Sequence, residues 1–384
     1  MVIMEAADGV RSYPNALNIF LTKRCNLDCR YCFVKKDSRN EKEISTLALK
    51  KAVNIFLTLP GSDKKIGITG GEPLLSFDKI KYLSSYIQKE NTGDLKSSVT
   101  VTTNGTALTL NRFKFIKKNK VIIRVSVDGK KAIHDYNRPF RRKNNGSTYE
   151  RIVANLNRIQ RYKNGHNIGA SLVFSPQTAG NLLENIKSLW KLGFNCIDFY
   201  PDLYAQWDKN KLDKLELTFR KFTDFYLSIF KDAKEKKDIF ENSLLRTFIS
   251  EEGLYKPILC QKIHLDWKGN FYCCDKVFSI PGLKRKSFII GDVHKGIDNG
   301  LRIKLLEEKR KEIRNLTGKD CNSCKYLKYC FCAIGHYIYF SSNGLDFKQY
   351  FPQFCRLSQI YNSSFLEIKR KLLPNHLFSS IYRT

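Results

Sequence analysis

The chain has 384 residues, enough for about two or three domains or for one barrel with an appendage. It contains 67 Lys and Arg residues and 37 Asp and Glu residues, which give a formal net charge of +30. No stretch approaches the roughly 18 consecutive apolar residues of a membrane span, and residues 1–14 lack the basic and apolar regions of a signal peptide, so we expect a cytoplasmic protein with no membrane partner. In that compartment the 12 cysteines favour metal or redox chemistry over disulfides.

The first predicted strand leads into a cysteine-rich loop. Residues 18–21 read as a largely apolar strand, and Cys25, Cys29 and Cys32 follow with the spacing C-x3-C-x2-C, with Tyr31 directly before the third cysteine. Three thiolates from one tight loop can converge on a point and leave a four-iron cluster one ligand short. The alternative is a zinc site, but structural zinc is held by four ligands. The loop therefore favours an iron–sulfur cluster with one open iron.

A regular alternation of strands and helices follows the loop. Ser45 can cap a helix that runs through Leu59, and Pro60-Gly61 ends it. Strands are predicted at residues 18–21, 65–69, 98–102, 121–127, 169–174 and 195–201. Further helices are predicted near residues 77–88, 108–118, 149–162 and 181–192. This spacing is typical of repeated βα units and predicts an α/β fold with a parallel sheet.

Glycines and polar residues cluster where these strands end. The second strand runs into Gly70-Gly71-Glu72-Pro73, and two glycines let the backbone approach a ligand closely. The fourth strand contains Ser126 and is followed by Arg138, whose guanidinium group matches a carboxylate in two-point geometry. Because parallel barrels build their active sites at the C-terminal ends of the strands, we expect a binding site there.

A charged segment separates this alternation from a second group of cysteines. Residues 209–240 carry apolar side chains at helical spacing, which predicts a helix packed on the sheet. The cysteines beyond it are Cys260, Cys273, Cys274, Cys321, Cys324, Cys330, Cys332 and Cys355. The spacing Cys321-x2-Cys324-x5-Cys330 is typical of metal sites, and a zinc ribbon is one interpretation. Eight thiolates are also the number that ligates two four-iron clusters fully.

Together, the cysteine loop, Gly70–Pro73 and the segment from Ser126 to Arg138 resemble the radical S-adenosylmethionine (SAM) superfamily, and the second cysteine group resembles its SPASM extension. The resemblance implies a partial (β/α)6 TIM barrel with a C-terminal SPASM iron–sulfur domain. In that family SAM chelates the open iron, and the reduced cluster cleaves SAM to methionine and a 5′-deoxyadenosyl radical. Gly70–Pro73 would contact the amino group of SAM, Ser126 and Arg138 its ribose and carboxylate, and Tyr31 would also lie at the cofactor.

The resemblance also implies two auxiliary 4Fe–4S clusters, for three in all. The outer cluster would be held by Cys321, Cys324, Cys330 and Cys355. The inner cluster would be held by Cys260, Cys274 and Cys332, with Cys273 as its fourth ligand. Adjacent residues point their side chains in different directions, so Cys273 either completes the inner cluster or leaves it with an open iron. The chain also departs from the SPASM pattern at Asp266, where that pattern often has a cysteine, and in the short Cys330-x1-Cys332 spacing.

Asp275 is the candidate catalytic residue. The segment from Gly269 to Asp275 resembles the corresponding segment of anaerobic sulfatase maturases, in which the Asp after the cluster cysteine acts as a general base on the substrate. The alternative is that this Asp only forms hydrogen bonds within a loop, and the pattern leaves both roles open.

The resemblance divides the chain into a radical SAM barrel at residues 14–205, a bridging helical segment at 206–255 and a SPASM domain at 256–384. It implies hydrogen abstraction from a ribosomally made peptide to install a crosslink or an epimerised residue. The alternative is an anaerobic sulfatase maturase that forms formylglycine from Cys or Ser. The implied partners are a precursor peptide or protein and an electron donor of the flavodoxin or ferredoxin type.

The positive charge suggests a third class of function, a non-catalytic basic iron–sulfur protein that binds nucleic acid. The basic residues are spread along the chain, and they do not interleave with aromatic residues in one block. No helix-turn-helix or RNA-binding signature is present either. We therefore expect no nucleic-acid partner, whereas an acidic peptide substrate is compatible with the charge.

Overall fold

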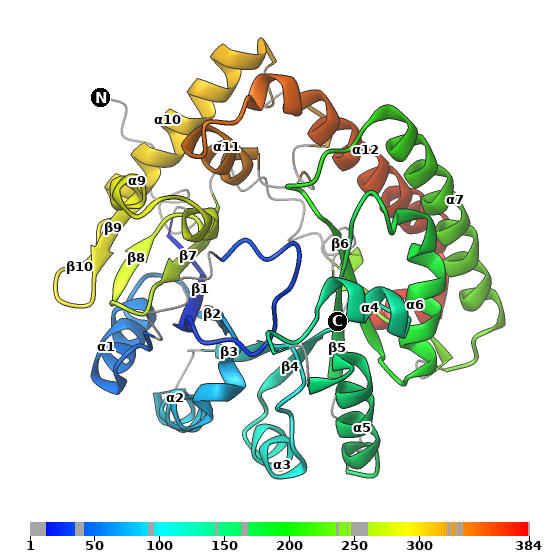
Figure 1. The fold of residues 1–384 in the computed structure, drawn as a ribbon, viewed down its shortest axis with the longest axis horizontal. Helices are drawn as coiled ribbons and strands as arrows, with labels where there is room; N and C mark the ends of the chain where they lie inside the picture. Colours follow the sequence, from blue (N-terminus) through cyan, green and yellow to red (C-terminus); the bar gives the residue numbers. More distant parts are fainter. Residues whose placement is uncertain are drawn as a thin grey trace.

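Six parallel strands and the helices between them form the first part of the computed structural model (Figure 1). The structure describes residues 13–34, 42–90, 96–142, 145–162, 168–235, 238–243, 245–246, 260–319, 321, 324–326, 330 and 333–382. The strands are β1 (Ala16–Thr22), β2 (Asp63–Gly70), β3 (Lys96–Thr103), β4 (Ile122–Ser126), β5 (Ile168–Phe174) and β6 (Cys196–Pro201). Each strand pairs in parallel with the next one along the chain, which confirms the predicted strands and their α/β arrangement.

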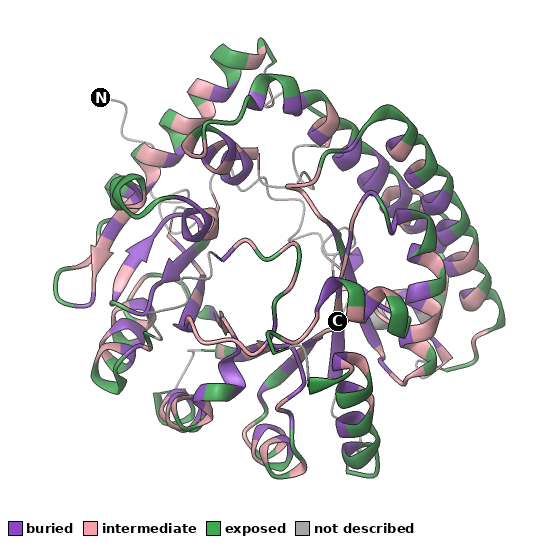
Figure 2. Ribbon diagram, viewed as in Figure 1, coloured by how far each residue is buried: buried purple, intermediate pink, exposed green. Residues whose placement is uncertain are grey.

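The connecting helices lie around the outside of this sheet. They are α1 (Thr46–Leu57), α2 (Phe77–Glu90), α3 (Leu110–Lys118), α4 (Lys131–Asn137), α5 (Thr148–Gln160) and α6 (Leu182–Lys191), with the short turns η2 (Pro73–Ser76) and η4 (Ala179–Asn181). Ser45 caps α1 as predicted, because its hydroxyl accepts the backbone N–H of Ala48 at 3.1 Å. The 7-residue helix α4 was not predicted, because it is short and no side chain caps its N-terminus. Figure 2 shows that the strands are largely buried and that the helices expose their outer faces.

Two long helices, α7 (Lys209–Asp232) and α12 (Phe347–Leu372), lie side by side over the outer face of β6 (Figure 1). Phe199 of β6 joins them, since its ring centroid lies 5.0 Å from that of Phe222 on α7 and 5.9 Å from that of Phe365 on α12. The predicted helix at 209–240 therefore exists and packs on the sheet, but it ends at Asp232. The backbone N–H groups of residues 234 and 235 instead bind the carboxylate of Asp238, which turns the chain.

The C-terminal region extends the same sheet. Strand β7 (Lys262–Leu265) pairs in parallel with β1, and β8 (Asn270–Tyr272), β9 (Ile289–Asp292) and β10 (Gly296–Ile297) follow in antiparallel pairs. The complete sheet has 10 strands in the order β10-β9-β8-β7-β1-β2-β3-β4-β5-β6. This continuity was not predicted, because strands as short as the 3 residues of β8 or the 2 of β10 carry no readable periodicity.

Asp266 forms the turn between β7 and β8. One carboxylate oxygen accepts the backbone N–H groups of Lys268 at 2.8 Å and of Asn270 at 2.9 Å, and the other accepts the hydroxyl of Tyr272 at 3.1 Å. Gly269 completes the turn with φ +87°, a conformation that side chains rarely adopt. The position at which the SPASM pattern often has a cysteine therefore holds a turn-forming carboxylate.

The remaining helices complete the C-terminal region. They are η7 (Asp275–Ser279), α9 (Gly282–Arg285), η8 (Lys286–Phe288), α10 (Asn299–Thr317), α11 (Ala333–Ser342) and α13 (His376–Tyr382). In Figure 1, α10, α11 and α12 run from the β9–β10 side of the sheet to the β6 side. Among the helices of the described residues, none is both long and apolar enough to cross a membrane.

Candidate active site at the C-terminal ends of the strands

The cysteine loop follows the C-terminal end of β1 and is held in place by the segment after α4. Residues Leu27 and Phe140 form an antiparallel bridge. On either side of it, the N–H of Asp28 donates to the carbonyl of Pro139 at 2.8 Å, and the N–H of Arg30 donates to the carbonyl of residue 137 at 2.9 Å. The loop therefore has a backbone partner along much of its length and is ordered by the fold itself.

The three thiols of this loop belong to one electrostatic group. Burial raises the pKa of Cys25 to about 12; the N–H of Leu27 lowers it, whereas Glu72, Cys29 and Cys32 add to the rise. Thiols in such a group favour the protonated form until a metal centre supplies positive charge, since metal binding deprotonates its thiol ligands. The Cys32 side chain is exposed, and the other two thiols are partly buried. The three predicted ligands therefore lie within electrostatic range of one another on this loop.

The glycine pair after β2 brings two backbones into contact. Gly70 has φ +129°, and the N–H of Gly71 donates to the carbonyl of Thr22 at 2.7 Å. A Cβ atom on Gly71 would lie only 2.0 Å from the carbonyl oxygen of Arg24. We expected these glycines to admit a ligand. The closest approach in the structure is to the start of the cysteine loop, so the glycines also fix the loop against β2.

Glu72 holds the neighbouring strand ends together. Its buried carboxylate accepts the hydroxyl of Thr103 at 2.6 Å and the backbone N–H groups of Asn104 at 2.7 Å and Leu74 at 2.9 Å. Burial raises the pKa of Glu72, although these hydrogen bonds oppose the rise. The carboxylate is therefore occupied within the protein. If Gly70–Pro73 contact SAM as predicted, they would do so through their backbone.

Asp128 is the centre of a buried network that sequence reasoning did not identify as a site. Its carboxylate accepts the hydroxyl of Tyr31 at 2.5 Å, the amide of Asn137 at 3.0 Å and the guanidinium of Arg138 at 3.0 Å. Burial alone would raise the pKa of Asp128, but Arg138 and the hydrogen bonds outweigh it and hold the pKa below its ordinary value. The backbone N–H of Asp128 donates to Nδ1 of His134 at 3.2 Å. The network joins the cysteine loop, β4 and α4.

Arg138 and Ser126 lie near this network. The guanidinium of Arg138 lies 5.0 Å from the ring centroid of Tyr31, and its Nε atom is buried with no hydrogen-bond partner among the described residues. Ser126 is partly buried at the end of β4, opposite Ser171 of β5. Contact of Arg138 and Ser126 with SAM stays a prediction, but a buried donor without a partner fits a bound carboxylate.

Asp275 begins η7, directly after Cys274. Its carboxylate pairs with the ammonium of Lys276 at 3.1 Å, and 31% of its side chain is exposed. Burial raises the pKa of Asp275, but Lys276 and the nearby His264 outweigh it and hold the pKa well below its usual range. His264 is itself buried, which lowers its pKa to about 4, and its Nδ1 has no hydrogen-bond partner among the described residues. This site therefore contains an ionised carboxylate next to a neutral imidazole.

The adjacent cysteines before Asp275 face different surroundings. Burial lowers the pKa of Arg302 on α10, whereas the thiols of Cys260 and Cys273 raise it, so both cysteines lie beside this guanidinium. Arg302 also donates from Nη1 to the carbonyl of Cys260 at 2.7 Å. The sulfur of Cys274 lies instead on the Asp275 side, 3.8 Å from one of its carboxylate oxygens. Cys273 therefore shares its surroundings with Cys260, as a ligand of the same cluster would.

The outer cysteines also form one electrostatic group. Burial raises the pKa of Cys330 to about 12, and the thiols of Cys355, Cys321 and Cys324 contribute to the rise. These are the four residues predicted to hold the outer cluster. The fifth cysteine of this region, Cys332, lies outside the described residues. No three Cys, His, Asp or Glu side chains in the described part of the chain converge closely enough to hold a single metal ion.

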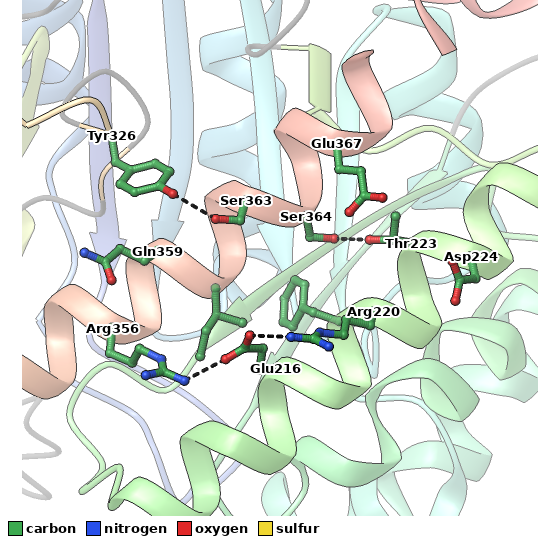
Figure 3. A pocket seen from close by; sticks show the side chains of 12 residues that line it. Glu216, Arg220, Thr223, Asp224, Tyr326, Arg356, Gln359, Ser363, Ser364 and Glu367 are labelled. Carbon is green, nitrogen blue, oxygen red and sulfur yellow. Dashed lines mark hydrogen bonds and ion pairs between the residues drawn. The ribbon is translucent and has the colours of Figure 1, made fainter. Parts of the chain in front are cut away.

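An open groove of about 740 Å³ lies elsewhere, between α7 and α12 (Figure 3). Part of its charge is neutralised within the groove, since Glu216 binds Arg220 at 3.0 Å and Arg356 at 2.6 Å. The groove lies on the outer side of β6, away from the edge of the sheet that carries the cysteine loop. Its size therefore does not make it the active site.

A comparison with family models identifies the class of this barrel. Residues 19–189 match the Radical SAM superfamily, a span that runs from β1 into α6 and includes the cysteine loop and the strand ends described above. The chain therefore contains a radical SAM domain. That family binds SAM and a 4Fe–4S cluster, and the three thiols of one loop fit such a cluster with one open iron.

The chain is homologous to anaerobic sulfatase-maturating enzymes. It is 26% identical over 334 residues to the cysteine-type enzyme of Clostridium perfringens, an alignment that covers 80% of this chain and 84% of that protein. It is 29% identical over 190 residues to the cysteine-type enzyme of Clostridium novyi, and this alignment covers 47% of this chain and 49% of the relative. The solved structure of native anSMEcpe with bound AdoMet and Cp18Cys peptide has the same fold, with a TM-score of 0.69 and 21% identity over 93% of this chain and 99% of that one.

Proposed function

We propose that this chain is a radical SAM enzyme that oxidises a cysteine or serine side chain of a peptide or protein substrate to formylglycine. The observation that carries the proposal is the partly exposed, ionised carboxylate of Asp275, placed directly after Cys274 and ion-paired with Lys276. The homology to cysteine-type maturases over 80% of the chain supports the same reaction. Formylglycine formation was the alternative in the sequence analysis. Because of this homology, we now rank it ahead of crosslinking and epimerisation.

The radical-generating half of the site would be assembled from neighbouring strand ends. Cys25, Cys29 and Cys32 would hold the 4Fe–4S cluster, and Gly70–Pro73 would contact the amino group of SAM through their backbone. Arg138, with its buried Nε, would bind the SAM carboxylate, and Ser126 and Tyr31 would line the same site. When bound, the cluster and SAM supply a 5′-deoxyadenosyl radical that removes a hydrogen atom from the substrate side chain.

Asp275 would accept the proton that the substrate thiol or hydroxyl loses as its carbon is oxidised, and an auxiliary cluster, when present, would supply the acceptor for the second electron. A serine would then give the aldehyde directly, whereas the thioaldehyde from a cysteine would exchange its sulfur for the oxygen of water and release hydrogen sulfide. A carboxylate that is ionised in the resting enzyme can act as a base without first losing its own proton. About 31% of the Asp275 side chain is exposed, so a substrate that binds beside it would reach the carboxylate.

The two other cysteine groups would hold the auxiliary clusters, which supply one-electron transfer when they are present. The outer set is Cys321, Cys324, Cys330 and Cys355. The inner set would be Cys260, Cys273, Cys274 and Cys332. The shared position of Cys260 and Cys273 beside Arg302 supports Cys273 as a ligand, and Cys274 would reach the same cluster from the Asp275 side. Electrons would reach the enzyme from a donor of the flavodoxin or ferredoxin type.

A peptide crosslink or epimerisation is the second candidate. It is favoured by the segment from Cys260 to Cys274, where the chain departs from the SPASM pattern because Asp266 forms a turn and Cys273 stands beside Cys274. Such a departure changes the surroundings of the inner cluster, and these surroundings would decide the fate of the substrate radical after hydrogen abstraction.

Anaerobic reconstitution with iron, sulfide, SAM and a one-electron reductant tests the proposal. Peptides with a central Cys, Ser or Ala would be incubated with the enzyme and measured by mass spectrometry. We expect an aldehyde at Cys or Ser, no change at Ala, and loss of the aldehyde in Asp275→Asn but not in Asp292→Asn, whose carboxylate lies in an exposed turn. A loss of two hydrogens without an aldehyde would support crosslinking, and one deuterium gained from heavy water would support epimerisation. Absence of 5′-deoxyadenosine would support a non-catalytic binding protein.

A further inference from the structure

Lys276 links three separate parts of the site. Its ammonium group lies 3.1 Å from the carboxylate of Asp275, 4.7 Å from the ring centroid of Phe33 and 5.7 Å from that of Tyr204. Phe33 directly follows Cys32 on the cysteine loop, and Tyr204 follows β6. The Lys276 side chain therefore contacts both the cysteine loop, which follows β1, and the segment that follows β6, the last of the six parallel strands.

The surroundings of Lys276 restrict how it can move. Only 19% of its side chain is exposed. The Phe33 ring packs edge-on against Phe20, whose ring lies tilted against Phe278 of η7 with ring centroids 3.9 Å apart. Tyr204 packs on Tyr339 of α11 with ring centroids 4.2 Å apart. An ammonium group between a carboxylate and two aromatic faces is attracted by all three, and the rings on which it rests are themselves fixed.

Asp275 has few other groups to hold it. The sulfur of Cys274 is 3.8 Å from its Oδ1, which is a weak contact, and Lys276 makes the one ion pair shown for Asp275 in the described part of the chain. Without the ammonium group, rotation of the Asp275 side chain would be restricted only by that thiol, by the weaker electrostatic influence of His264 and Lys262, and by packing. A base must lie within hydrogen-bond reach of the proton that it removes, so small rotations decide whether it reacts.

We propose that Lys276 is a positioning residue that fixes the Asp275 carboxylate relative to the cysteine loop, and thus aligns the proton acceptor with the place where the substrate radical is made. The inference rests on the proposed role of Asp275. In this arrangement Lys276 acts on the second half of the reaction, after SAM cleavage. Loss of its charge separates the two halves: the radical is still generated, but the substrate is no longer converted efficiently.

Three variants test this role in the reconstituted full-length enzyme. Lys276→Met removes the charge and keeps much of the side-chain length, Lys276→Arg keeps the charge, and Lys286→Met changes a lysine of the same region as a matched control. Iron content, 5′-deoxyadenosine and modified peptide would be measured for each. We expect Lys276→Met to keep its iron and to form 5′-deoxyadenosine within about 2-fold of wild type, while modified peptide falls by about 10- to 100-fold. Lys276→Arg should recover most of the product, and Lys286→Met should match wild type.

The ratio of 5′-deoxyadenosine to modified peptide is the decisive quantity, because a purely structural defect lowers both together. A Lys276→Met enzyme with an unchanged ratio, or with equal losses of both products, overturns the inference. Failure of the proposed function has a different signature, since the wild-type enzyme would then form 5′-deoxyadenosine without converting any Cys or Ser peptide to an aldehyde. If Asp275→Asn leaves the product unchanged while Lys276→Met lowers it, Lys276 acts on another group and the positioning role is also wrong.

Discussion

Replacement of Asp128 by Asn tests how the cysteine loop is held. The Asp128 side chain is 0% exposed and that of Arg138 is 8% exposed, so their ion pair is shielded from water. Tyr31, on the cysteine loop, donates to the same carboxylate at 2.5 Å. Asn has nearly the same size, so the substitution opens no cavity. It removes the negative charge and replaces one acceptor oxygen with a donor group.

The expected cost follows from this geometry. Removing one partner of a buried ion pair costs about 3–5 kcal/mol, because the other charge stays buried without compensation. Each hydrogen bond to a charged group contributes about 1.5–3 kcal/mol, but these bonds share the Asp128 carboxylate and do not add to the ion pair in full. We therefore expect Asp128→Asn to lower the free energy of unfolding by about 3–5 kcal/mol, a large part of the roughly 5–15 kcal/mol of a folded protein.

Urea denaturation under anaerobic conditions measures this loss, and iron analysis measures its effect on the first cluster. Asp135→Asn is the matched control. Its carboxylate accepts hydrogen bonds from Ser147 and Thr148, and it lies on α4, the helix whose Asn137 binds Asp128, but it does not touch the cysteine loop. We expect Asp128→Asn to lower both the unfolding midpoint and the retention of iron by the loop, and Asp135→Asn to lower the midpoint alone. A wild-type midpoint in Asp128→Asn, or equal iron loss in the two variants, would refute the reasoning.

Three other substitutions test individual residues. Gly71→Ala places a Cβ atom 2.0 Å from a backbone oxygen of Arg24, so we expect this variant to lose iron from the cysteine loop. Gly282→Ala is the control, because its Cβ atom would have no neighbour within 4 Å, and we expect it to keep its full iron content. Equal iron contents in the two variants would contradict this. Burial holds the pKa of His134 at about 4, below the ordinary 6.5, so the stability that it contributes is present above pH 6.5 and is lost as the pH falls toward 4. In His134→Gln, the loss of unfolding free energy between pH 6.5 and 4 should be smaller than in wild type by up to about 3 kcal/mol. Parallel curves of unfolding midpoint against pH for the two proteins would disprove this. Arg302→Met removes a positive charge beside Cys260, so we expect the reduction potential of the proposed inner cluster to fall by roughly 50–100 mV in an anaerobic titration, and an unchanged potential would argue against this placement.

Long, periodic elements were predictable from the sequence and short ones were not. Strand β2 was found because Ile66 and Ile68 are buried apolar residues that lead directly into two glycines. Helix α1 was found from its Ser45 cap. The strands of the C-terminal region are too short for a period to appear, and β7 joins the sheet through pairing with a strand far away in sequence. Such pairing depends on tertiary packing, to which local patterns are insensitive.

At the site, the sequence predicts candidate ligands but not the internal partners of each side chain. The spacing of the cysteine loop predicts Cys25, Cys29 and Cys32 as ligands of the first cluster, and in the structure their thiols influence one another electrostatically. The ion pair between Asp128 and Arg138 could not be predicted from the sequence. Both residues belong to the same motif, and the motif does not show which side chain faces a ligand and which binds a neighbour. Lys276 was missed because a lysine beside an aspartate is ordinary in a basic chain. Only its contacts with two distant aromatic rings distinguish it.

The position of β1 between β2 and β7 affects how this protein can be divided. Residues 16–19 of β1 pair with 262–265 of β7, so a truncation after α7 would leave that side of β1 without its hydrogen-bonding partner. An exposed strand edge with apolar side chains such as Leu17 and Ile19 invites pairing with another molecule and aggregation. The barrel and the C-terminal region are therefore poor candidates for separate expression, and a chimaera with a related enzyme should exchange segments beyond β7 while keeping that strand with the barrel.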